Sequence, residues 1–62
     1  MTATASTLSA HTVRQYADNL SRFSAESAER QIAAHVQRGD FNTADAARVA
    51  TATAFYRRYG TA

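Results

Sequence analysis

The residues that could carry chemistry are concentrated near the end of the chain, in the stretch FYRRYG that runs from Phe55 to Gly60. Aromatic side chains frame Arg57 and Arg58 there. Arginine binds phosphates and aromatic rings stack on bases, so the stretch could contact a nucleic acid. Tyrosine and arginine are equally typical of the energetic centres of protein interfaces. A third interpretation is structural: the rings close a core, and the arginines complement the negative end of a helix dipole.

Two overlapping sets of candidate residues follow from these interpretations. We predict that a protein partner would contact Val49, Phe55, Tyr56, Arg57, Arg58 and Tyr59. If a nucleic acid is bound, we predict phosphate contacts at Arg48, Arg57 and Arg58. Every basic side chain is an arginine, whose planar fork suits phosphate, although a biased codon usage would also produce this pattern. The net charge of +2 is too small to argue for nucleic-acid binding by itself.

The remaining reactive side chains do not form a recognised catalytic pattern. Histidine is the side chain that most often serves in acid–base chemistry, but for His11 and His35 we expect surface or capping roles. Two glycines cannot build a phosphate-binding loop, and two histidines without cysteine cannot complete a closed zinc site. An arginine lies three or four residues from most of the carboxylates, which predicts solvated ion pairs at Asp18, Glu26, Glu29, Asp40 and Asp45. We therefore expect a protein that is not an enzyme and has no catalytic residue, cofactor or metal.

The spacing of apolar residues predicts helices as the elements that position these side chains. A stripe with helical period extends from Val13 to Phe23 and predicts a first helix over residues 10–23. A second helix is predicted over residues 25–38, because Ser24 offers an N-cap and Gly39 suits the residue after a helix.

The third predicted helix spans residues 43–59 and carries the candidate cluster. Val49, Ala52, Tyr56 and Tyr59 are spaced as one apolar stripe, and Gly60 follows. The fold class is thus predicted to be all-α, a small bundle of three short amphipathic helices. Residues 1–8 are expected to be a flexible tail, and residues 9–62 a single small domain.

A nine-residue phrase occurs twice, as RQYADNLSR at Arg14–Arg22 and as RQIAAHVQR at Arg30–Arg38. Both copies read as an amphipathic helix segment with a closing arginine near its end. Either a duplication or two independent amphipathic helices in a biased composition would produce this similarity, and the sequence leaves both possibilities open.

The length of 62 residues limits the core that the chain can build. A domain of this size buries only about 60% of the surface that its unfolded chain exposes. Small scaffolds usually add a disulfide, a metal or a second subunit, and cysteine is absent. We therefore expect self-association, as a homodimer, or a bound protein partner.

Apolar runs are too short for a membrane span, which needs about 18–20 residues. The N-terminal stretch MTATASTLSA has neither a basic residue nor an apolar segment of the kind found in secretory signals. We expect a cytoplasmic protein that binds neither a membrane nor a small-molecule substrate.

The stretch IAAHVQRGDFNTADAAR, residues 32–48, resembles the region that joins two helices in ParD-type antitoxins of the ribbon-helix-helix class. Val36, Gly39, Phe41 and Thr43 match that region in type and spacing, and Arg48 lies near an arginine position of the family. The family reads DNA with an N-terminal ribbon of alternating residues, whereas residues 10–23 here follow a helical period. The resemblance implies a dimeric, helix-paired regulator. It does not imply that this chain has a DNA-reading strand.

These observations lead to two functional hypotheses. The first is a non-enzymatic helical protein–protein interaction module with a regulatory role. The alternative is a small DNA-binding regulator or antitoxin that places its C-terminal arginines on phosphates.

Overall fold

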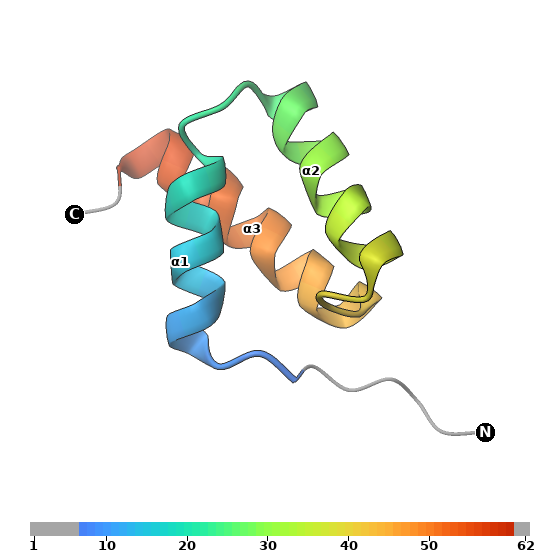
Figure 1. Ribbon diagram of the computed structural model, residues 1–62. Helices are drawn as coiled ribbons and strands as arrows, with labels where there is room; N and C mark the ends of the chain where they lie inside the picture. Colours follow the sequence, from blue (N-terminus) through green and yellow to red (C-terminus); the bar gives the residue numbers. More distant parts are fainter. Residues whose placement is uncertain (1–6, 61–62) are drawn as a thin grey trace.

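The structure is a computed structural model, and it describes residues 7–60. It contains helices α1 (Ala10–Leu20), α2 (Ala25–Arg38) and α3 (Thr43–Tyr59), with no strand among the described residues. The longest helix, α3, is the one against which α1 and α2 both pack (Figure 1). The predicted all-α class and the three-helix arrangement are confirmed.

Each helix begins at a polar side chain that replaces a missing backbone hydrogen-bond partner. These N-caps are Ser9, Ser24 and Asn42, and each accepts a hydrogen bond from the backbone N–H three residues later. Such caps are worth about 1 kcal/mol each. The three helix starts are therefore fixed locally by the sequence.

The C-terminus of α2 is closed by a glycine in the left-handed conformation. Gly39 has φ 83°, and its N–H donates to the carbonyl oxygen of Val36 at 3.0 Å. The N–H of Asp40 donates to the carbonyl oxygen of His35 at 2.9 Å, which completes a Schellman motif. This motif reverses the chain toward α3, as the position of Gly39 predicted.

The prediction for the end of α1 was wrong by three residues, because the helix ends at Leu20 and not at Phe23. The hydroxyl of Ser21 donates to the carbonyl oxygen of Asp18 at 2.8 Å, and the N–H of Phe23 donates to Leu20 at 3.1 Å in a tighter turn. The next residue, Ser24, must be extended to cap α2. The chain therefore leaves the helical path early, and the side chain of Phe23 is 46% exposed.

The core lies where α1 and α2 meet the inner side of α3. Its buried apolar side chains are Val13, Ala17, Leu20, Ala28, Phe41 and Val49. Phe41, from the turn between α2 and α3, packs against the ring of Tyr16 edge to face, with ring centres 5.2 Å apart. The imidazole of His35 stacks on Phe41 at the same centre distance. These rings fix the α2–α3 turn against α1.

The first turn of α3 also holds the segment that precedes α1. The carboxylate of Asp45 is completely buried and accepts the backbone N–H of Thr7 at 3.0 Å, that of Leu8 at 3.2 Å and the hydroxyl of Thr7 at 2.8 Å. The guanidinium of Arg48 donates to the carbonyl oxygen of Leu8 at 2.7 Å and to Asp45 at 3.3 Å. We call this set of contacts the Asp45 latch.

The Asp45 latch changes two expectations from the sequence. The Asp45–Arg48 pair was predicted to be a solvated ion pair, and that was wrong, because the carboxylate is buried against backbone N–H groups. The flexible tail was predicted to include residues 7 and 8, but Thr7 and Leu8 are held by Asp45. The rest of that predicted tail, residues 1–6, lies outside the described residues.

Replacing Asp45 tests the latch. We expect Asp45→Ala to lower the free energy of unfolding by roughly 2–4 kcal/mol, because hydrogen bonds to a charged group contribute about 1.5–3 kcal/mol each. Urea denaturation followed by far-ultraviolet circular dichroism measures the loss. Asp18→Ala is the matched control, since Asp18 makes an exposed pair with Arg22 at 3.6 Å and such pairs contribute at most about 1 kcal/mol. Equal losses in the two variants would contradict the latch.

Candidate functional site

Helix α3 differs from α1 and α2 in having small or apolar side chains on its outer side as well as its inner side. Its inner row, Asp45, Val49 and Thr53, is buried. Its outer residues include Ala47, Ala50, Thr51, Ala54, Phe55 and Tyr59, all exposed. We call these six residues the α3 face. A contiguous exposed surface of small and apolar side chains is typical of interaction sites, so we treat the α3 face as a candidate binding surface.

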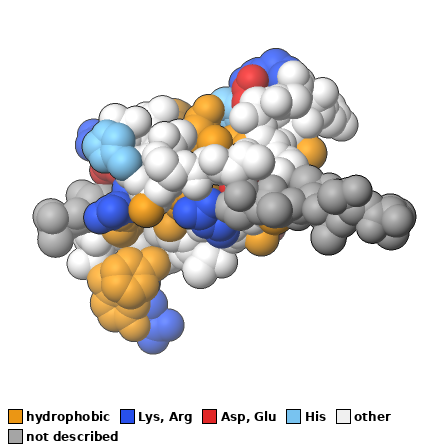
Figure 2. Space-filling model, turned by 90° about the horizontal axis from the view of Figure 1, so that it is seen from below, with side chains coloured by type: hydrophobic (Ala, Val, Ile, Leu, Met, Phe, Trp, Pro, Cys, Tyr) orange, Lys and Arg blue, Asp and Glu red, His pale blue; other side chains and the backbone are white. Residues whose placement is uncertain are grey.

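Two large rings project from the C-terminal part of the α3 face. Phe55 is 56% exposed and Tyr59 is 65% exposed, and their ring centres are 4.8 Å apart. The guanidinium carbon of Arg58 lies 5.5 Å from the centre of the Tyr59 ring, which is within cation–π range. Figure 2 shows a projecting cluster of hydrophobic side chains with basic side chains beside it.

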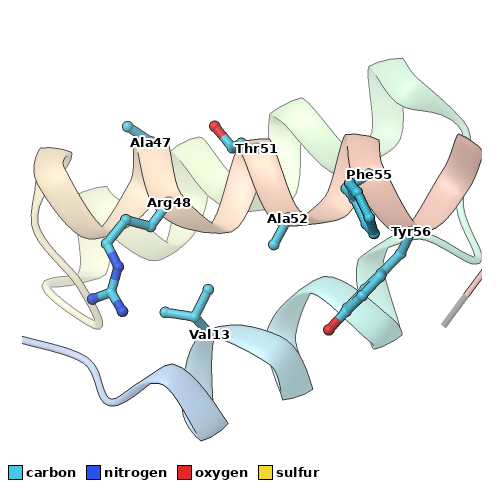
Figure 3. Close-up of a pocket in the computed structure, with 7 residues that line it drawn as sticks. All are labelled: Val13, Ala47, Arg48, Thr51, Ala52, Phe55 and Tyr56. Carbon is cyan, nitrogen blue, oxygen red and sulfur yellow. The ribbon is translucent and has the colours of Figure 1, made fainter. Parts of the chain in front are cut away.

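An open groove of about 590 Å³ lies beside these rings, between α1 and α3. Val13 contributes from α1, and α3 contributes Ala47, Arg48, Thr51, Ala52, Phe55 and Tyr56. In Figure 3, Arg48 lies at one end of the groove, and the rings of Phe55 and Tyr56 lie at the other. The lining is mainly carbon, so the groove suits an apolar side chain better than a charged ligand.

The structure separates the predicted partner-binding residues into two groups. Phe55, Tyr56 and Tyr59 lie together around the groove and the exposed rings, next to Arg58. Val49 is fully buried in the core, so its prediction as a partner contact was wrong. The apolar spacing of α3 does not distinguish its two sides, and only the packing of α1 and α2 shows that Val49 points inward.

Several of the residues that shape the groove are small and were not predicted to belong to a binding site. Ala47, Thr51 and Ala52 line it, together with Val13 from α1. Alanine and threonine occur throughout this chain, so no local signal distinguished these positions. Their contribution depends on α1 lying alongside α3.

The predicted phosphate contacts do not form one cluster. Arg48 donates to Leu8 and Asp45 within the latch, and Arg57 donates to the carbonyl oxygen of Phe23 at 2.9 Å. Arg48 and Arg57 are nine positions apart on α3, which corresponds to about 14 Å along the helix axis. A phosphate contact from Arg48 would compete with the latch, whereas Arg58 lies at the exposed rings.

A separate polar cluster lies at the α2–α3 turn. The Nδ1 atom of His35 is 2.8 Å from a carboxylate oxygen of Asp40, and the guanidinium of Arg38 is 3.0 Å from the same oxygen. The hydrogen bond with His35, and then that with Arg38, holds the pKa of Asp40 below its ordinary value. These contacts support the Schellman turn, so His35 has a role at the helix end. His11 is exposed near the start of α1.

The described residues form neither a metal site nor a membrane-spanning helix. Within residues 7–60, no group of three or more His, Asp or Glu side chains is arranged to hold a metal ion. None of the three described helices combines the length and the apolar content needed to cross a bilayer.

The sequence was also compared with known proteins. No protein-family model matches it, and neither a curated protein nor a solved structure does. The resemblance of residues 32–48 to ParD-type antitoxins therefore stays a prediction.

The Asp40 cluster predicts a specific response to acid. Because the pKa of Asp40 is lower in the folded chain than its ordinary value of 3.8, the cluster stabilises the fold above that pH. This contribution is lost as the pH falls through the folded-state pKa. A carbon NMR titration of the Asp40 carboxyl group should give a midpoint below 3.8, and His35→Gln should move it upward. A midpoint at or above 3.8 in the unmodified protein would contradict the assignment.

Proposed function

We propose that this chain is a non-enzymatic protein–protein interaction module and that the α3 face is its binding surface. The observation that carries the proposal is the exposure of Phe55 and Tyr59 beside an apolar groove. Single exposed apolar residues are ordinary, but two adjacent rings next to a groove form a continuous apolar surface.

The energetics of burial support this role. With about 200 Å² for a fully exposed aromatic side chain, the two rings leave roughly 240 Å² exposed. Covering that area would contribute about 6 kcal/mol at 25 cal/mol/Å². Association costs about 4–15 kcal/mol in lost freedom of motion. Burial of the rings alone does not exceed that range, so the groove and the small residues around it must also contribute contact area. An interface that covers the whole α3 face provides both.

The residue types at the surface also suit a protein partner. Tyrosine and arginine are enriched among the side chains that dominate binding energy, and the core of an interface is poor in other charged residues. The α3 face has Tyr59 and the neighbouring Arg58, and none of its six residues is acidic or basic. A partner would therefore bury little unpaired charge there.

The proposal is tested by placing a photo-crosslinking amino acid at Thr51, in the centre of the α3 face, in living cells. We expect a covalent protein adduct, because a bound partner would lie within reach of that side chain. The same amino acid at Glu26, an exposed position on α2, is the matched control and should give none.

A second variant confirms which side chains hold the partner. Phe55→Ser combined with Tyr59→Ser should abolish the Thr51 adduct while changing the free energy of unfolding by less than about 1 kcal/mol, since both rings are mainly exposed. Circular dichroism checks that the fold is retained. If Thr51 gives no adduct, or an adduct that survives loss of both rings, the proposed function is wrong.

The alternative hypothesis, a DNA-binding regulator, is favoured by the adjacent Arg57 and Arg58 at the end of α3. With two phosphate contacts per chain, the logarithm of the binding constant should fall with the logarithm of salt concentration at a slope of about −2. Arg57→Gln with Arg58→Gln should remove most of that slope, and Arg14→Gln with Arg30→Gln is the control. A gel-shift assay that shows no complex at low salt would eliminate this alternative.

A further inference from the structure

Large and small side chains follow a fixed order along the α3 face. Ala47, Thr51, Phe55 and Tyr59 are spaced four residues apart, so they form one exposed row along the helix. The row has small side chains in the first half of the helix and rings in the second half. The groove that could receive a ring is lined by Ala47 and Thr51 of the same row.

A surface with a projection and a hollow on the same side can bind a copy of itself through a twofold axis. We infer that the partner of the α3 face is a second copy of this chain, with the two α3 helices packed antiparallel and the axis near Thr51. This inference rests on the proposed function and names the partner for the same surface.

The register follows from the spacing of the row. Phe55 lies four residues after Thr51, and Ala47 lies four residues before it. Rotation about an axis at Thr51 therefore places each Phe55 ring opposite Ala47 of the second copy, within the groove. Each ring then meets a small side chain, which is how well-packed helix interfaces interdigitate.

The arginines at the end of α3 favour the antiparallel direction over the parallel one. A parallel pair would place Arg57 and Arg58 of the two copies side by side, and like charges in contact weaken association. The antiparallel pair separates them by about 20 Å, at a rise of 1.5 Å per residue. A parallel pair would also set each Phe55 against Phe55 of the second copy and leave both grooves unfilled.

A stable dimer needs more contact area than the two exposed rings supply, so its interface would include the groove and the small residues beside it. A standard interface covers about 800 Å² of each partner, which is about a fifth of the 4383 Å² surface of this chain. The rings of Phe55 and Tyr59 supply roughly 240 Å² of that, taking about 200 Å² for a fully exposed aromatic side chain. The groove of about 590 Å³, lined in part by Ala47 and Thr51, adjoins Phe55.

A second apolar groove among the described residues does not have this self-complementarity. It lies between α2 and α3, measures about 500 Å³, and is lined by side chains that include Ile32, Ala33, Val36 and Ala50. The exposed large hydrophobic side chains of residues 7–60 are Phe23, Phe55 and Tyr59, and none of them lines that groove. A second copy is therefore expected at the α1 side of α3.

Single cysteines test the position of the axis, because the chain has none of its own. Thr51→Cys places two thiols next to the axis, and oxidation of the pair should form a disulfide between the copies. Ala47→Cys is the control on the same face. Its two thiols would be about 12 Å apart along the direction of the helices, which is beyond disulfide reach. Ala33→Cys on α2 measures random collision. We expect a crosslinked yield at Thr51 at least about tenfold above both controls.

Exchanging the ring and the small residue tests the register. Ala47→Phe should weaken dimerisation at least about tenfold in sedimentation equilibrium, because the new ring at position 47 would clash with Phe55 of the second copy. Ala47→Phe combined with Phe55→Ala should restore the affinity to within about threefold, since the two positions face each other. Position 47 is exposed, so the fold should persist, and circular dichroism checks this.

The outcomes separate this inference from the proposed function. The antiparallel dimer is supported if the mass in solution is twice 6.7 kDa and the disulfide forms at Thr51→Cys but not at the control positions. It also requires that Phe55→Ala restore the affinity lost in Ala47→Phe. A monomer at high micromolar concentration, equal yields at the three cysteines, or absence of rescue overturns it. If the photo-crosslinker at Thr51 nevertheless yields an adduct with a different protein, the interaction module stands and the second copy is wrong.

Discussion

The buried carboxylate of Asp45 connects two parts of the chain that are far apart in sequence, the start of α3 and the segment that precedes α1. It lies in the first turn of α3, accepts hydrogen bonds from the segment that leads into α1, and contacts the guanidinium of Arg48. A carboxylate with no exposed surface is stable only when its oxygens are satisfied, and here backbone N–H groups and a hydroxyl satisfy them. Among the described residues, no buried side-chain nitrogen or oxygen lacks a hydrogen-bond partner. Without the latch, the start of α1 and the start of α3 could move independently.

The latch also determines the shape of the candidate surface. By holding the start of α1 beside α3, it places Val13 as one wall of the groove and fixes Arg48 at the end of that groove. Arg48 is thereby committed to intramolecular contacts, which is why the arginines that the sequence grouped as phosphate contacts are not equivalent in the structure. The α3 face is consequently apolar over most of its length, with basic charge only near its end.

The small core explains why α3 is covered on one side only. Two short amphipathic helices have one apolar stripe each, and both stripes are used against the inner row of α3. None of the helices described within residues 7–60 covers the outer side of α3, and Phe55 and Tyr59 are exposed there. The same shortage of apolar mass that makes a small domain marginal leaves a surface suited to another protein.

The sequence by itself determined the local features of this protein. Ser24, Gly39 and the helical period fixed the number of helices, their order and most of their ends, because caps and periodicity act over a few neighbouring residues. Only the tertiary structure decided which side of α3 is inside. Its spacing allowed Val49 to be grouped with the rings, and the pairing of Asp45 with Thr7 joins residues 38 positions apart. Such contacts depend on how α1 packs across α3, and no local pattern in the sequence encodes that packing.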